Sequence, residues 1–165
     1  MALDGIFLRH IKQEIENEIL GSRVNQIYQP NRDELVLVLR GYSGSKKLLL
    51  SARANSPRVN FTEHAPENPA QPPMFCMLLR KHLVGARIAE LHQPLRERMM
   101  IFELDAYDEM GVAVKKQLVV EMIGRSSNII LVGEDGRIID CMRRMDFGGS
   151  VERRMLPGMI YRDPP

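Results

Sequence analysis

Residues 96–99 (RERM) place one acid between two arginines in a short segment. Arginine presents a planar fork of donors to a base edge or a phosphate, and glutamate accepts a hydrogen bond from an exocyclic amine. Glu97 and Arg98 therefore have the chemistry to read a nucleotide. The segment also leads into a strand-like run, and a plain charged loop is the alternative interpretation of the same pattern.

A second unusual segment is Glu121-Met122-Ile123, which continues into residues 124–128 (GRSSN). It places an acid among apolar neighbours and then a polar turn that contains Arg125. Such a turn can cap a neighbouring element or bind an anion, although an ordinary structural turn is the default interpretation.

Basic residues cluster at four places along the chain. They are Arg80, Lys81, His82 and Arg87; Arg96 and Arg98; Lys115 and Lys116; and Arg143, Arg144, Arg153 and Arg154. Antiparallel strands could bring some of these together to neutralise phosphates. The formal net charge is only +2, so on charge alone a solvated mixed-charge surface is the favoured interpretation.

Other kinds of site find little support. The two cysteines are far apart and the four histidines are scattered, so we expect no metal and no cofactor. His10 and Glu14 are one helical turn apart, which is a common surface pair. The segment 41–45 (GYSGS) does not match a nucleophile elbow. Cys76 lies in an apolar stretch and is predicted to be a core thiol.

Composition indicates one globular domain. The chain has 165 residues, of which 44% are hydrophobic and 27% are charged, enough for a core without disulfides. Two thiols and a start unlike a secretory signal favour a reducing cytoplasm. No apolar run approaches the roughly 18 residues that span a bilayer, so we expect no membrane association.

The pattern predicts two helices and nine strands. Apolar residues at four-residue spacing predict a helix over 4–20, with Asp4 as N-cap and Gly21 after its end. Pro72-Pro73 and Gly85 bound a second helix over 74–83, whose apolar first half is expected to be buried. The predicted strands are 24–29, 34–40, 46–52, 58–63, 86–92, 98–107, 112–123, 128–132 and 137–142.

This order predicts an α+β fold, with two antiparallel sheets packed as a sandwich and two flanking helices. Strands follow one another without helices between them, which disfavours a doubly wound parallel sheet. We expect one domain over 1–155. The end of the chain, 156–165, is predicted to be a linker towards further domains, because it is rich in Pro and Gly and has no closing element.

The sequence closely resembles the N-terminal domain of the NFACT family over nearly its whole length. The resemblance is carried by residues 2–5 (ALDG), 25–30 (NQIYQP), 48–52 (LLLSA), 72–83 (PPMFCMLLRKHL) and 121–131 (EMIGRSSNIIL). It implies a factor of ribosome-associated quality control that binds the large subunit carrying a stalled peptidyl-tRNA. It also implies recruitment of tRNA(Ala) for untemplated alanine tailing.

The family positions tied to tRNA recognition correspond to Asp4, Glu97 and Arg98. Glu97 stands where the family usually has Asp, so its acceptor reaches one methylene further. The resemblance also places Glu121, Met122, Ile123 and Arg125 near the same tRNA surface.

The domain is also similar to the N-terminal domain of formamidopyrimidine-DNA glycosylases, a two-sheet sandwich flanked by helices. Those enzymes attack with an N-terminal proline followed by glutamate, whereas this chain begins Met1-Ala2-Leu3-Asp4. The covalent step therefore has no evident nucleophile, and we expect a binding module rather than an enzyme. The fibronectin-binding label attached to the NFACT family suggests an alternative function, a surface adhesin.

Overall fold

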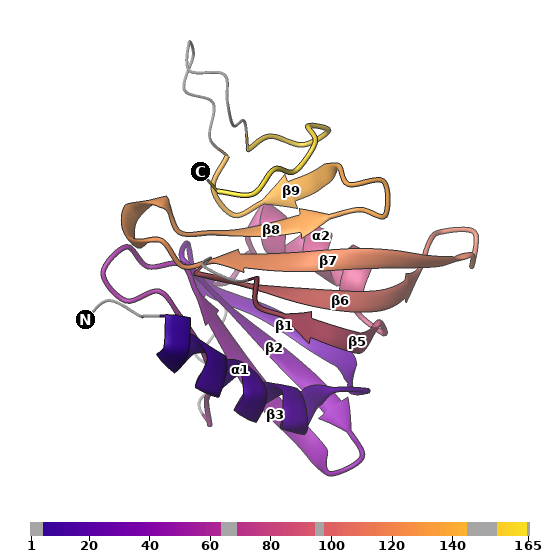
Figure 1. The fold of residues 1–165 in the computed structure, drawn as a ribbon. Helices are drawn as coiled ribbons and strands as arrows, with labels where there is room; N and C mark the ends of the chain where they lie inside the picture. Colours follow the sequence, from indigo (N-terminus) through magenta and orange to yellow (C-terminus); the bar gives the residue numbers. More distant parts are fainter. Residues whose placement is uncertain (1–4, 64–68, 95–97, 145–154, 165) are drawn as a thin grey trace.

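The computed structural model describes residues 5–63, 69–94, 98–144 and 155–164, and the side chains from residue 10 onward within them. Figure 1 shows two helices packed on a strongly twisted antiparallel sheet. The α+β class and the antiparallel pairing agree with the sequence analysis.

Both helices lie close to their predicted bounds. Helix α1 spans Gly5–Ile19 and buries Ile15 and Ile19. Helix α2 spans Met74–Leu83 and buries four side chains, those of Phe75, Cys76, Leu79 and Leu83. The expectation that the apolar first half of α2 is buried holds for Phe75 and Cys76 but is wrong for Met74 and Met77, whose side chains are exposed to 76% and 55%. A helix packed on a sheet has an outer face, whatever residues occupy it.

The nine predicted strands are all present. They are β1 (Arg23–Asn31), β2 (Glu34–Gly41), β3 (Gly44–Ser51), β4 (Arg58–Phe61), β5 (Arg87–His92), β6 (Met99–Tyr107), β7 (Ala113–Glu121), β8 (Asn128–Val132) and β9 (Ile138–Cys141). Every residue of β2 from Glu34 to Leu39 is buried, as expected for a strand covered on both faces.

The expectation of two sheets is wrong, because the strands form one sheet in the order β4-β3-β2-β1-β5-β6-β7-β8-β9. The two groups of strands are joined into one sheet at a single junction, where β1 pairs with β5. Hairpin signals reveal pairing between consecutive strands, and no local signal reveals pairing across a helix. The likeness to the glycosylase domain stays a prediction.

The junction of β1 and β5 is formed by two helix-to-strand turns. Helix α1 leads through Gly21 into β1 and α2 leads through Gly85 into β5, with φ angles of +86° and +90°. The Gly21 amide donates to the Ile88 carbonyl at 2.8 Å, and the Gly85 amide donates to the Val24 carbonyl at 2.8 Å. We call residues 21–24 and 85–88 the seam.

The other hydrogen bonds of the seam follow the same reciprocal pattern. The Val24 amide donates to the Ala86 carbonyl at 2.9 Å, and the Ile88 amide donates to the Ser22 carbonyl at 2.8 Å. The register of β1 and β5 contains one residue pair, Arg23 opposite Arg87. The two turns are therefore related by a local two-fold axis that passes between these arginines.

The sheet has a hydrophobic core on each face. The larger core contains buried side chains of both helices and of all nine strands except β9. Figure 1 shows α1 in front of the β1–β3 half and α2 behind the β6–β8 half, so the sheet turns strongly between its halves to give both helices one core. The smaller core, on the other face, contains Met99, Val119 and Ile130 and is covered by Met155 and Tyr161.

The C-terminal segment 155–164 is packed on β9 rather than extended into solvent. The Ile138 amide donates to the Met159 carbonyl at 2.7 Å, and the Tyr161 amide donates to the Gly136 carbonyl at 2.9 Å. The segment was expected to be a linker, but Met155 and Tyr161 within it cover the smaller core. The boundary at residue 155 and the further domains beyond it stay predictions. No helix in the described ranges is long and apolar enough to cross a membrane.

The positive φ angles at the seam give a first prediction. Replacement of Gly85 by Ala forces a side chain into the left-handed region, although nothing lies within 4 Å of the added Cβ. We expect a loss of about 1–2 kcal/mol in the free energy of unfolding, measured by urea denaturation. Gly21→Ala is expected to cost a similar amount, because the two turns are equivalent.

Asparagine tolerates the left-handed region better than alanine, so Gly85→Asn is the matched control and is expected to lose less stability than Gly85→Ala. Equal losses for the two variants would show that backbone strain is not the cause.

Candidate functional site

One end of the sheet gathers the candidate site. Strands β1, β5, β7 and β9 end there, and β2, β6, β8 and α2 begin there. Within each half, alternate turns share an edge of the sheet, and the ion pair between Arg143 and Asp33 shows that turns of both halves meet at this site end. Of the predicted site residues, Asp4 and Glu97 lie outside the described residues.

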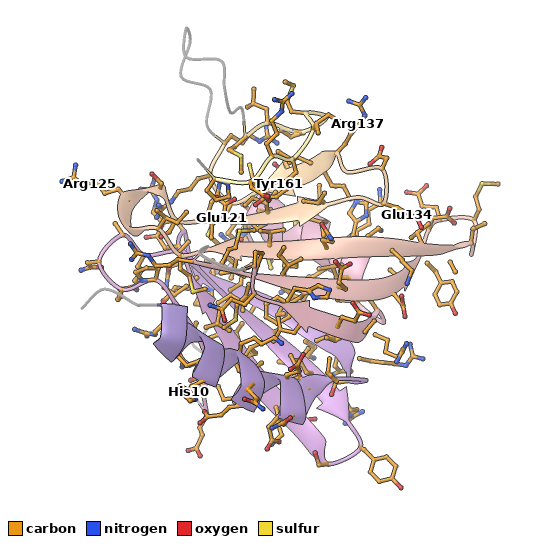
Figure 2. All side chains as sticks on the ribbon, in the orientation of Figure 1. His10, Glu121, Arg125, Glu134, Arg137 and Tyr161 are labelled. Atoms are coloured by element: carbon orange, nitrogen blue, oxygen red, sulfur yellow. The ribbon has the colours of Figure 1, made fainter. Side chains whose placement is uncertain are left out.

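The remaining predicted residues are brought together at the site end. The Met122 amide donates to the Arg98 carbonyl at 2.8 Å, which joins the start of β6 to the chain after β7. Arg125 then lies in a single 3-10 turn, η1 (Gly124–Ser126), closed by a hydrogen bond of 2.7 Å from the Ser127 hydroxyl to the Gly124 carbonyl. Arg98 and Arg125 are both exposed. Figure 2 shows Arg125 extended away from the sheet.

Glu121 and Met122 face the interior instead. Both side chains are fully buried, and Met122 belongs to the larger core. Tyr161 lies beside Glu121 (Figure 2), and its hydroxyl donates to the Glu121 carboxyl group at 2.6 Å. Ile123 is half-buried. Direct contact with a ligand is therefore most accessible to Arg98, Ile123 and Arg125, whereas Glu121 holds the turn against the cover segment.

Arg143 ties the turn to the β1–β2 hairpin. Its guanidinium donates to the Ser127 carbonyl at 3.2 Å and to the Asp33 carboxylate at 2.5 Å. Its backbone exchanges two hydrogen bonds with the Asn128 amide side chain, at 2.9 and 3.0 Å. These bonds fix the positions of three loops relative to one another.

Two further arginines extend the charge of the site end. Arg144 donates two hydrogen bonds to Asp140, at 3.2 and 3.3 Å, and this pairing raises the pKa of Arg144. Arg32 lies exposed in the β1–β2 turn. Arg32, Arg143 and Arg144 line a groove of about 790 Å³, whose other walls include Pro73 and Met74 at the start of α2.

The site end therefore carries two kinds of arginine. Arg143 and Arg144 are neutralised by Asp33 and Asp140. Arg32, Arg98 and Arg125 have no carboxylate partner among the residues that the structure describes. Exposed guanidinium groups without partners are free to form bidentate hydrogen bonds with phosphates or base edges.

The two cysteines, both among the described residues, are poorly suited to nucleophilic attack. Both thiols are buried. Burial, and secondarily Asp140, raises the pKa of the Cys141 thiol to about 12, so little thiolate exists at neutral pH. Burial also raises the pKa of Cys76, which confirms the interpretation of a core thiol. No group of three metal-ligating side chains occurs within the described ranges.

Sequence reasoning did not find three of these residues. Arg32 is a single basic residue in a turn, followed directly by Asp33, and Tyr161 lies in the segment expected to be a linker. Asp33 pairs with Arg143 across a separation of 110 residues. None of the three carries a local signal, because spacing along the chain does not report contacts between distant loops.

The buried hydrogen bond between Tyr161 and Glu121 gives a second prediction. Tyr161→Phe removes a donor from a fully buried carboxyl group, and we expect a loss of about 1.5–3 kcal/mol in the free energy of unfolding. Urea denaturation measures this change. Tyr107→Phe is the control, because the Tyr107 side chain is 67% exposed, and its loss should be near zero. Equal stability of both variants would mean that the bond contributes nothing.

Comparisons with known proteins place this chain in a family. The family described as NFACT N-terminal and middle domains matches residues 4–165. The Rqc2 homolog RqcH of Bacillus subtilis is 39% identical over 166 residues, which cover 100% of this chain and 29% of that protein. The chain thus spans less than a third of the length of this relative.

Solved structures agree with the match. The N-terminal domain of the fibronectin-binding protein PavA from Streptococcus pneumoniae superposes with a TM-score of 0.95 at 37% identity, and the match covers 99% of this chain and 62% of that one. The N-terminal part of the fibronectin/fibrinogen-binding protein from Streptococcus suis gives a TM-score of 0.95 at 39% identity, with the same coverage of 99% and 62%. The chain therefore belongs to the NFACT family.

Proposed function

We propose that this chain is the tRNA- and ribosome-binding module of a cytoplasmic ribosome-associated quality control factor. In this proposal it binds the large subunit that carries a stalled peptidyl-tRNA and recruits tRNA(Ala) for untemplated alanine tailing. Support at family level comes from relatives named as Rqc2 homologs. The observation that carries the proposal is the group of arginines at the site end, three of them without a carboxylate partner in the described part of the chain.

The charge of the site end suits a folded RNA better than a small ligand. Each phosphate that an arginine neutralises releases counterions and adds a salt-dependent increment to the affinity. Arg32, Arg98 and Arg125 project from three different turns, so they can contact phosphates along a backbone rather than converge on one anion. Net charge of the whole chain, +2, does not reveal this local excess.

Discrimination between tRNAs requires contacts with base edges as well as phosphates. In the proposal, Arg98 and Glu97 supply such contacts, and Asp4 acts with them. Arg125 approaches the same RNA from η1. Glu121 and Met122 act through the backbone of this turn, which they anchor from the interior.

We further propose that the chain acts by binding and not by catalysis. The exposed arginines at the site end carry permanently charged guanidiniums, which stabilise anions but do not exchange protons near neutral pH. The chemistry of tailing would then belong to the ribosome, with this module choosing and placing the tRNA.

The proposal predicts that tRNA binding depends on Arg98 and Arg125, for which the described ranges contain no carboxylate partner. In the full-length protein, Glu97→Ala/Arg98→Ala and Arg125→Ala should each reduce the tRNA recovered by crosslinking and the alanine tails formed. For each phosphate that a variant no longer neutralises, the slope of log affinity against log salt should become shallower by about 0.7–0.9. Affinity measured over a series of salt concentrations checks this.

Arg40→Ala is the matched control. Arg40 is also exposed and has no carboxylate partner among the described residues, but it lies eight residues from Arg32, roughly 25 Å away along β2. Its substitution should leave the salt slope unchanged. Undiminished tRNA recovery and tailing in the Glu97→Ala/Arg98→Ala protein would refute the proposed function.

A second candidate function is that of a fibronectin-binding adhesin, because two similar structures carry that name. The two functions predict different distributions in cells. If the protein reads RNA, it should sediment with large ribosomal subunits and be released by salt. If it is an adhesin, it should be cut by protease added to intact cells, and fractionation of one culture measures both outcomes.

A further inference from the structure

The opposite end of the sheet holds a buried lysine. Lys116 lies on β7, and its register partner on β6 is Leu104. The residue is only 8% exposed, and its neighbours along the same face, Leu118 and Val120, belong to the larger core. Lysines are almost never so buried without partners that satisfy the ammonium.

The Lys116 ammonium has one hydrogen-bond partner among the described residues. Its Nζ lies 2.8 Å from Nδ1 of His82, in the last turn of α2. An ammonium can only donate, so Nδ1 of His82 accepts and the ring carries its proton on Nε2. An ammonium has three N–H donors, and two of them have no acceptor in the described part of the chain.

Nearby carboxylates do not satisfy these two donors. Asp108 Oδ1 accepts hydrogen bonds from the amides of Met110 and Val112, at 2.9 Å each, which close the β6–β7 turn. Glu109 forms an ion pair of 3.0 Å with Lys81. Glu109 is thus engaged elsewhere, and no hydrogen bond joins Asp108 to Lys116 in the described part of the chain. Burial lowers the pKa of Lys116, and the charge of Asp108 offsets this lowering only in part.

Lys116 and His82 also line a hollow. A depression of about 430 Å³ is lined by Lys81, His82, Lys116, Tyr107, Met110 and the two acids of the turn. Its volume lies within the range of small-ligand sites. Burial, and then the charge of Lys116, lowers the pKa of His82, and burial likewise lowers the pKa of Lys116. A bound anion would offset both effects.

From the buried ammonium, its single acceptor and the adjoining hollow, we propose that Lys116 and His82 form a binding site for one oxyanion, a phosphoryl or carboxylate group. The Lys116 ammonium donates two hydrogen bonds to its oxygens, and Lys81 stands at the rim. The site lies at the end of β6 and β7 away from Arg98 and Arg125, so it is separate from the proposed tRNA surface.

The test is isothermal titration of the full-length protein with inorganic phosphate, acetate and a dinucleoside monophosphate, at constant ionic strength in chloride. At least one probe should bind saturably, with a dissociation constant on the order of 1 mM, as expected for a small anion. Lys116→Met, which preserves the packing of the side chain, should weaken this binding at least tenfold. A phosphate or acetate response identifies a free anion, and a dinucleotide response identifies an RNA phosphodiester.

Lys115→Met is the control, because Lys115 is the exposed neighbour on the other face and pairs with Asp105. It should bind the same probe as tightly as the unmodified protein. His82→Gln is a second variant, which keeps an acceptor for Lys116 and should weaken binding less than Lys116→Met. Absence of saturable binding for every probe, or equal weakening by Lys115→Met and Lys116→Met, would overturn the proposal while leaving the tRNA experiments unaffected.

Discussion

The seam is the constraint on which the rest of the structure depends. Four backbone hydrogen bonds between residues 21–24 and 85–88 join two halves that each begin with a helix and continue as strands. Without them the nine strands would form two sheets. The two-fold axis places Arg23 opposite Arg87, two like charges, and each finds its own acceptor: Arg23 the Gly85 carbonyl at 3.0 Å, Arg87 the Asp105 carboxylate at 2.9 Å.

A continuous antiparallel sheet also divides the molecule into two ends. Turns from both halves meet at one end, where Arg143 joins Ser127 of the second half to Asp33 of the first. Arg32, Arg98 and Arg125 are exposed at this end, on turns whose positions such bonds help to fix. At the other end the β6–β7 hairpin and the end of α2 enclose a buried ammonium. One end is therefore suited to contact the surface of a large ligand, and the other is suited to bind a small anion.

Local patterns predicted the elements well but not their assembly. The helix Met74–Leu83 was bounded by Pro72-Pro73, whose fixed φ suits a helix start, and by Gly85, which readily adopts the positive φ that follows the helix end. The hairpins followed from turn residues. The seam, the Asp33–Arg143 pair and the cover of Glu121 by Tyr161 join residues 40 to 110 positions apart. Such contacts depend on three-dimensional proximity, which a single sequence does not encode by spacing.

For the site residues too, the sequence identified candidates by their chemistry but not whether each is exposed or buried. Residue chemistry singled out Arg98 and Arg125, and both are exposed at the site end. It equally singled out Glu121, an acid with apolar neighbours in the sequence, which is buried in the interior and bonded to Tyr161.

The seam has a further consequence for folding kinetics. Within each half, the strands pair as successive hairpins, which close short loops, whereas the seam joins residues 62 apart and so carries a larger loop-closure entropy. We expect each half to acquire its hairpins early and the seam to close last.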